Sequence, residues 1–234
     1  VHGLPHMGYC ESGGLLKYAH FDGTAWRIER VDQVGFSGVV FTSLALDTFN
    51  RPHISYLDWD DGDLKYARFD GISWYTETVD SWNDVGWYTS LALDTAGRPH
   101  ISYYDITNNT LKYARFDGTA WKIETVDSNL GWKGGYTSLA LDVSGRPRVS
   151  YYDWTNQALK YAYFDGATWH IEVVDTNLGY GGYTSLALDA GGRPHVSYYD
   201  GTNHALKYAR FVAGAWQVQT VEGNSPGYTS LVVD

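Results

Sequence analysis

The sequence predicts an all-β fold, a five-bladed β-propeller made of four-stranded antiparallel blades. The first observation is an internal repeat, because Thr-Ser-Leu recurs at intervals of 47, 48, 47 and 45 residues. A period of about 40 to 50 residues is typical of a propeller blade or of a helical repeat. The second observation is that the runs inside each repeat alternate with a period of two residues, which indicates strands. The copies of the repeat are marked by Thr42, Thr89, Thr137, Thr184 and Thr229.

Each repeat contains four strand-like runs. In one copy they are YTSLALD (136–142), VSYYD (149–153), LKYAYF (159–164) and WHIEVV (169–174). Turn signals separate these runs, among them Gly145 before proline and the Asp165-Gly166 pair, in which glycine accepts the positive φ of a tight hairpin. We therefore expect each repeat to form an antiparallel meander.

Side-chain size sets the expected order of the strands in a blade. Blades converge at the axis of a propeller, so the innermost strand needs small residues, and Ser138 and Ala140 in the first run meet that need. The fourth run carries charged residues such as Lys122 and Glu124, which suit a solvated outer edge. The first run is therefore expected at the axis and the fourth at the rim.

The repeat predicts that residues 1–234 form a single domain. The expected blades are about 41–87, 88–135, 136–182, 183–227, and a fifth made of 228–234 together with 1–40. The final run, YTSLVVD (228–234), reads as a lone first strand. We expect it to join the N-terminal blade and to close the ring in the Velcro manner, which would remove an open sheet edge.

Composition excludes several classes of protein. There are 17 Lys and Arg against 27 Asp and Glu, and the net charge of −10 argues against a general nucleic-acid binder. No apolar run approaches the roughly 20 residues of a membrane helix. The single cysteine, Cys10, excludes a disulfide framework and a cysteine-based zinc site. An inert thiol is the preferred interpretation of Cys10, and no cofactor is expected.

The blade layout resembles that of small lectin propellers. The run PHISYYD (99–105), followed by LKYARFDGTAW (111–121), is similar to blades of the fucose-binding propeller lectins. The five-fold count resembles the tachylectin type, and Phe116 to Trp121 resembles a degenerate Asp-box turn of sialidase-like propellers. The resemblance implies carbohydrate binding and, together with the composition, an extracellular or cell-surface location. We assign no residue here to the paired arginine and glutamate ligands of the fucose lectins.

Candidate ligand-binding residues lie in the loops between the second and third strands and between successive blades. These loops should emerge on one face of the propeller. An aromatic ring can stack on the C–H face of a sugar, while Asn and Asp can bond to its hydroxyl groups. The alternative is that the rings fill gaps between blades. The candidates are Trp59, Trp82, Trp87, Asn108, Trp132, Trp154, Asn156, Tyr180, Asn203, Asp105, Asp153 and Asp200.

Other repeated polar residues have structural interpretations. A carboxylate ends the second run and a lysine begins the third, as in Asp200 and Lys207, and a cross-strand pair within the blade is favoured over a ligand clamp. Histidines after proline, such as His100, are expected to bond to an aspartate of a neighbouring turn and not to bind a metal. The acidic loop at 58–63 could attract calcium, but it is preferably interpreted as a solvated loop.

Three functions remain after these observations. The preferred one is a multivalent, non-catalytic carbohydrate-binding protein whose partners are glycans or polysaccharides. The second is a structural module that docks on a protein partner in a surface assembly. The third is a glycosidase, which is disfavoured because near-identical blades do not readily supply carboxylates in two different environments.

Overall fold

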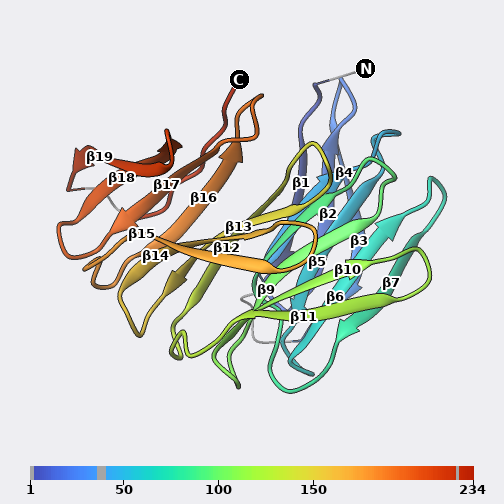
Figure 1. The fold of residues 1–234 in the computed structure, drawn as a ribbon. Helices are drawn as coiled ribbons and strands as arrows, with labels where there is room; N and C mark the ends of the chain where they lie inside the picture. Colours follow the sequence, from blue (N-terminus) through green and yellow to red (C-terminus); the bar gives the residue numbers. More distant parts are fainter. Residues whose placement is uncertain (1–2, 36–40, 225–226) are drawn as a thin grey trace.

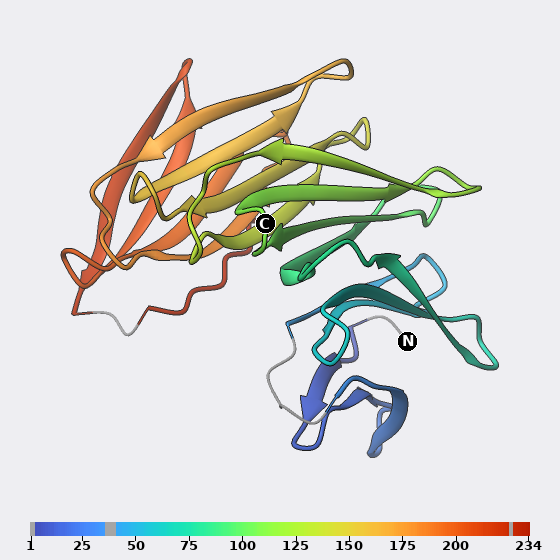
Figure 2. The same cartoon turned by 90° about the horizontal axis from the view of Figure 1, so that it is seen from below.

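The computed structural model describes residues 3–35, 41–224 and 227–234 and contains five antiparallel sheets (Figure 1). The predicted all-β, five-bladed architecture is confirmed. The sheets follow one another in chain order around an arc, with the first sheet at one end and the last at the other (Figure 2). Within the described residues, no helix is long and apolar enough to cross a membrane.

The strands have the following bounds. The first sheet has three: β1 (His6–Glu11), β2 (Leu15–Phe21) and β3 (Trp26–Gln33). The second contains β4 (Thr42–Leu46), β5 (Pro52–Asp58), β6 (Asp63–Phe69) and β7 (Trp74–Asp80). The third contains β8 (Trp87–Leu93), β9 (Pro99–Asp105), β10 (Thr110–Phe116) and β11 (Trp121–Asp127). The fourth contains β12 (Gly135–Leu141), β13 (Pro147–Asp153), β14 (Ala158–Phe164) and β15 (Trp169–Asp175). The fifth contains β16 (Gly182–Leu188), β17 (Pro194–Asp200), β18 (Ala205–Val212) and β19 (Ala215–Gly223).

The first strand of each complete blade lies at the axis, as its small residues predict. The strands β4, β8, β12 and β16 contact one another in sequence across neighbouring sheets. The serine of each strand accepts a hydrogen bond from a backbone N–H of the next strand, and Leu139 N lies 3.0 Å from Ser90 Oγ. The same 3.0 Å contact joins Leu186 N to Ser138 Oγ. A small side chain at this position allows the approach and also supplies the acceptor.

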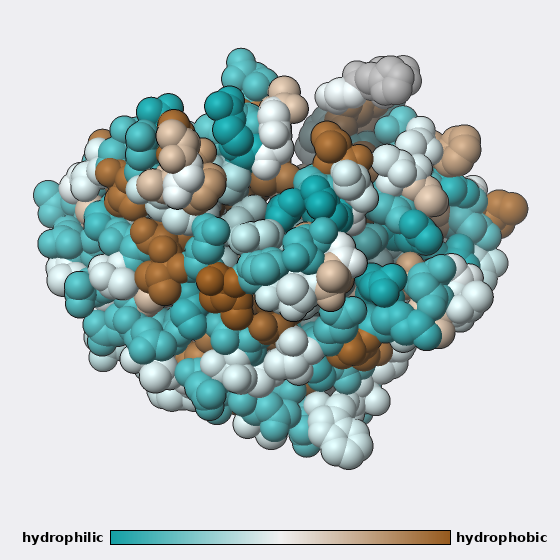
Figure 3. All heavy atoms as spheres, viewed as in Figure 1, coloured by the Kyte–Doolittle hydropathy of each residue, from teal (hydrophilic) through white to brown (hydrophobic). Residues whose placement is uncertain are grey.

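The hydrophobic core lies between successive blades. Second strands such as β9 are buried along their whole length, because neighbouring sheets cover both of their faces. The ring of Tyr113 meets the ring of Trp169 from the next blade edge to face at 5.3 Å, a geometry that aromatic pairs prefer. Hydrophobic side chains on the face seen in Figure 3 lie in small groups among polar ones.

Aromatic rings line a cavity of about 230 Å³ at one end of the inner strands. Tyr88, Tyr136 and Tyr183 are the second residues of β8, β12 and β16 and adopt positive φ values of 53°, 45° and 39°, which bulky residues rarely accept. The ring of Tyr88 approaches Gly135 so closely that a Cβ there would lie 2.7 Å from the tyrosine ring. Gly135 is therefore required for this ring to pack against the next blade.

The predicted Velcro closure is not found. Residues 227–234 contain no assigned strand, and the first sheet holds only β1, β2 and β3. The segment instead packs on the last blade, where Leu231 N lies 3.0 Å from Ser185 Oγ and Thr229 Oγ1 lies 2.7 Å from Ser197 Oγ. Such a bond joins a second strand to the inner strand of the next blade, as Ser150 and Thr184 do at 2.7 Å, so it does not require the segment to pair with β1. The segment therefore occupies an inner-strand position beside β16 without pairing with β1.

Candidate functional site

Three cavities lie between successive blades in the described part of the chain. All three are at the same end of the blades. This end carries the turns that follow the first strands and the hairpins that join the third and fourth strands. The cavity between the second and third sheets measures about 640 Å³. The next cavity, between the third and fourth sheets, measures about 380 Å³, and the one between the fourth and fifth about 200 Å³. The largest cavity is lined in part by Asp47, Phe49, His53, Tyr66, Arg68, Glu77, Arg98 and Phe116. A cavity of this size suits a small ligand.

Rigid turns form part of each cavity wall. In the third blade, Asp94 Oδ1 accepts the backbone N–H groups of Ala96 and Arg98 at 2.9 and 2.8 Å. Asp94 Oδ2 accepts the Arg98 guanidinium at 2.7 Å. Burial alone would raise the pKa of the Asp94 carboxyl, but these hydrogen bonds outweigh it and hold the pKa below its usual value. Asp94 is therefore an ionised structural anchor.

A histidine and a tyrosine form the inner wall of the two larger cavities. His53 Nδ1 contacts the Tyr66 hydroxyl, and His100 Nδ1 contacts the Tyr113 hydroxyl in the same way. The other ring nitrogen of His100 lies 3.7 Å from Asp94 Oδ2, so the expected histidine–aspartate contact is present at long range. Burial lowers the pKa of both histidines, which keeps the rings neutral near pH 7.

An arginine from the third strand and a glutamate from the fourth strand reach each of the two larger cavities. Tyr66 pairs with Glu77 across the β6–β7 ladder, and Arg68 follows Tyr66 by two residues, so Arg68 and Glu77 share one face of the sheet. In the next blade, Arg115 Nε lies 4.0 Å from Glu124 Oε1. A guanidinium beside a carboxylate offers donors and acceptors for adjacent ligand hydroxyls.

The hydrogen bonding of the indole N–H groups distinguishes one blade interface from the others. Trp169 Nε1 donates to Glu124 Oε2 of the preceding blade at 3.0 Å. Two other interfaces repeat this bond, from Trp74 Nε1 to Glu29 at 2.9 Å and from Trp216 Nε1 to Glu172 at 2.8 Å.

At the interface beside the largest cavity, the equivalent indole N–H, that of Trp121, is unpaired in the described part of the chain. Trp121 Nε1 is buried and has no hydrogen-bond partner among the described residues. Glu77, the glutamate equivalent to Glu124, is exposed and bonds to no described residue, while Arg68 stacks over the Tyr75 ring at 5.0 Å. A buried donor without a partner costs about 1–3 kcal/mol and calls for an explanation. Of these groups, the Glu77 carboxylate lines the cavity and is free to bond to a ligand there.

The blades differ at the two positions that carry the arginine and the glutamate. The third-strand position is His20, Arg68, Arg115, Tyr163 and Arg210 in chain order. The fourth-strand position is Glu29, Glu77, Glu124, Glu172 and Gln219. Only the second and third blades combine arginine with glutamate, so the cavities are not chemically equivalent.

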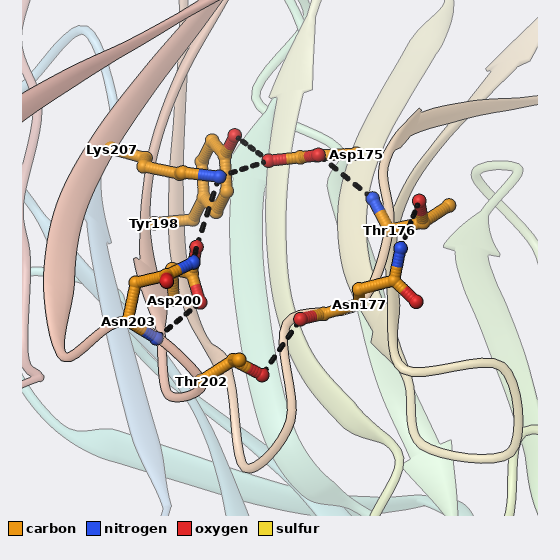
Figure 4. Close-up of polar contacts among 8 residues, drawn as sticks. All are labelled: Asp175, Thr176, Asn177, Tyr198, Asp200, Thr202, Asn203 and Lys207. Atoms are coloured by element: carbon orange, nitrogen blue, oxygen red, sulfur yellow. Dashed lines mark hydrogen bonds and ion pairs between the residues drawn. The ribbon is translucent and has the colours of Figure 1, made fainter.

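The predicted carboxylate and amide ligands lie at the opposite end of the blades in internal networks. Figure 4 shows Lys207 Nζ between Asp175 and Asp200, 2.9 Å from each carboxylate, with the Tyr198 hydroxyl donating to Asp175. Asn203 then bonds to Asp200 through both its backbone N–H and its side-chain amide. The same Asn–Asp arrangement joins Asn108 to Asp105 and Asn156 to Asp153. Asp105, Asp153 and Asp200 are each 1% exposed. These contacts are those of a structural network.

The predicted aromatic ligands fall into two groups and one isolated ring. Trp59 and Trp87 are partly buried with ring centroids 5.1 Å apart, and Trp87 Nε1 donates to Asp84 at 2.6 Å. Trp154 and Tyr180 lie 5.0 Å apart, and Trp132 belongs to the same cluster because all three rings contact Lys133. Trp82 is 74% exposed. The exposed rings do not fill gaps between blades.

In the part of the chain that the structure describes, neither the acidic loop at 58–63 nor the repeated histidines form a metal site. No group of three or more His, Cys, Asp or Glu side chains there is arranged to hold a metal ion. In the acidic loop, Asp58 bonds to Lys65 at 2.5 Å. Burial raises the pKa of the Cys10 thiol, which disfavours the reactive thiolate.

Sequence reasoning missed the cavities at the hairpin end. The available signal was the spacing of YARF (66–69) and WYTE (74–77) around a tight hairpin, which fixes the strand register. That register places Arg68 and Glu77 on one face. The hairpin alone does not show that the next blade supplies the opposite wall.

Comparisons with known proteins identify the fold. No family model matches the chain, and no curated protein matches it significantly. A mutant of the Aleuria aurantia lectin, solved with Fucα1-6GlcNAc, is 14% identical with a TM-score of 0.63, over 97% of this chain and 80% of the lectin. A protein of unknown function from Dyadobacter fermentans is 13% identical with a TM-score of 0.63, over 96% and 78% of the two chains. An ulvan lyase bound to -[GlcA(1-4)Rha3S]- is 12% identical with a TM-score of 0.64, over 95% and 68%. The chain therefore shares its fold with propellers that include both lectins and a polysaccharide lyase.

Proposed function

We propose that this protein is a non-catalytic, lectin-like carbohydrate-binding propeller whose sugar sites are the two larger cavities between blades. The observation that carries the proposal is the pair of Arg68 and Glu77 in the lining of the largest cavity, where the Glu77 carboxylate bonds to no described residue. A sugar hydroxyl can accept from the Arg68 guanidinium and donate to the Glu77 carboxylate at once. The nearby ring of Phe116 offers an apolar surface for the C–H face of the sugar.

The cavities favour binding over glycoside hydrolysis. A glycosidase requires a second carboxyl group with a raised pKa that acts as the acid. The second carboxylate at the largest cavity, Asp47, is bonded to Arg51, and these bonds hold its pKa below the usual value although burial opposes them. Asp47 is therefore poorly suited to donate a proton.

The test is a glycan array followed by titration calorimetry. Fucosylated glycans are the first probes, since the lectin of similar fold was solved with Fucα1-6GlcNAc. Glu77→Gln and Arg68→Met are expected to weaken binding about tenfold or more, because each removes a charge-assisted hydrogen bond to a sugar hydroxyl. Glu172→Gln is the matched control, because Tyr163 replaces the arginine of that blade.

The stoichiometry provides a second readout. The two cavities with both arginine and glutamate predict two sites per chain, the tighter at Glu77. Wild-type affinity in both Glu77→Gln and Arg68→Met would refute the site. Turnover of a bound glycan would refute the non-catalytic assignment.

A further inference from the structure

A second cluster, at the opposite end of the blades, combines three aromatic rings with one ammonium group. Trp132 and Lys133 belong to the loop between β11 and β12, Trp154 to the β13–β14 loop, and Tyr180 to the β15–β16 loop. Lys133 Nζ lies 4.5, 5.1 and 5.7 Å from the centroids of Trp132, Trp154 and Tyr180. We call these four residues the Lys133 cluster.

Backbone contacts fix the loops that carry the cluster. Thr155 N donates to Leu130 O at 3.1 Å, which ties the β13–β14 loop to the loop of Trp132. Gly131 approaches so closely that a Cβ there would lie 3.0 Å from the Trp154 ring. Gly201 is equally close to the backbone of Tyr180, where a Cβ would lie 2.6 Å from the carbonyl oxygen. The cluster is therefore built on loops that are packed together.

The rings of the cluster remain available at the surface. Trp132 is 62% exposed and Tyr180 is 73% exposed, while Trp154 is half-buried. Large aromatic groups gathered at the surface usually indicate interaction. Trp154 and Tyr180 meet edge to face, so the rings present surfaces in different directions.

Lys133 carries a charge that is paired with no carboxylate among the described residues. Every other lysine in the described ranges forms an ion pair with a carboxylate, whereas Lys133 has none within 4.0 Å. Ring contacts satisfy an ammonium group only in part, since its N–H donors bond far better to oxygen anions. Lys133 is therefore a partly buried cation without a carboxylate partner among the described residues, in a protein whose net charge is −10.

We propose that the Lys133 cluster binds an acidic sugar, a uronate or a sulfated sugar, independently of the cavities between blades. The rings stack on the C–H face of the sugar, and Lys133 pairs with its carboxylate or sulfate. The cluster exists once in the described chain, because Lys133 has no counterpart in the loops that carry Val85 and Tyr180. The site therefore binds a single acidic residue of a glycan, while the cavities bind neutral groups.

The test uses titration calorimetry and tryptophan fluorescence with three tetrasaccharide probes. The first contains glucuronate, the second is a sulfated galactan fragment, and the third is the same fragment after desulfation. Acidic probes are expected to bind at least tenfold more tightly than the neutral one, and their affinity should fall as salt concentration rises. Preference for one of the two acidic probes identifies the recognised anion.

The variants separate this site from the cavities. Lys133→Met keeps the length of the side chain without its charge, and it is expected to lower acidic binding at least tenfold. Lys122→Met is the control, because Lys122 is an exposed lysine paired with Asp117 at 3.4 Å. Glu77→Gln should leave acidic binding unchanged. Equal affinity for acidic and neutral probes, or wild-type acidic binding by a folded Lys133→Met variant, would overturn the proposal.

Discussion

Trp169 donates its indole N–H to Glu124 of the preceding blade at 3.0 Å, whereas Trp121, in the same position one blade earlier, has no described partner. This difference predicts unequal effects of the same substitution. Trp169→Phe should destabilise the protein by about 1 kcal/mol more than Trp121→Phe, because both lose the same ring volume but only Trp169 loses a hydrogen bond. Urea unfolding of the two variants measures the difference. Equal losses would show that the bond contributes nothing to stability.

The network of Figure 4 predicts a large effect at Lys207. Its ammonium lies 2.9 Å from both Asp175 and Asp200, and Asp200 is 1% exposed. Lys207→Met leaves two neighbouring carboxylates without their cation, so a loss of about 3 kcal/mol is expected. Lys122→Met, on the exposed rim, should change the free energy of unfolding by less than about 0.5 kcal/mol. A small effect of Lys207→Met would mean that solvent already screens the pair.

Buried histidines predict a loss of stability in mild acid. Burial lowers the folded-state pKa of His53 and His100, although Asp47 and Asp94 oppose the shift. Protonation therefore favours the unfolded chain. Stability should be fully present above pH 6.5, the unfolded value, and should fall as pH decreases through the lower folded values. The slope is at most about 1.4 kcal/mol per pH unit for each histidine.

Urea midpoints measured at pH 7.5 and 5.5 check this dependence. The double variant His53→Arg with His100→Arg is the control, because the fourth blade already carries Arg148 at the equivalent position, 2.7 Å from Asp142. Arginine stays charged at both pH values, so the dependence should flatten. A wild-type midpoint that is constant over this range would contradict the histidine assignment.

Deletion of residues 228–234 distinguishes an open arc from a closed ring. In the structure the segment bonds to Ser185 and Ser197 of the last blade, and Tyr228 packs on Tyr183 at 4.3 Å. The deletion should therefore increase hydrogen exchange along β16 and leave β1–β3 protected. Cooperative loss of protection throughout the chain would instead support closure of the ring.

The repeat explains how much of the fold could be predicted. Alternation of small and apolar residues marked the strands, and Ser138 and Ala140 identified the inner one, because each property depends on neighbours within one blade. Closure could not be predicted in this way. It depends on whether the first and last blades meet, and the pattern within one blade does not specify a contact between segments at opposite ends of the sequence.

The candidate site residues show the same contrast between properties that one chain segment reveals and properties that depend on its neighbours. Trp132, Trp154 and Tyr180 were singled out by residue type, and the structure brings them together around Lys133. The predicted carboxylates Asp153 and Asp200 are instead held inside their own blades by Asn156 and Asn203. Residue type cannot show whether a polar group already has a partner.

The sequence by itself determined the all-β class, the five repeats and the strand order, since these follow from periodicity and side-chain size along one chain segment. Only the tertiary structure decided where the cavities lie and which polar groups are free. A site between blades is made of residues about 45 positions apart, as Glu124 and Trp169 are. Whether they meet depends on how adjacent sheets pack. The unpaired Trp121 N–H and the lone Lys133 charge became visible only in that packing.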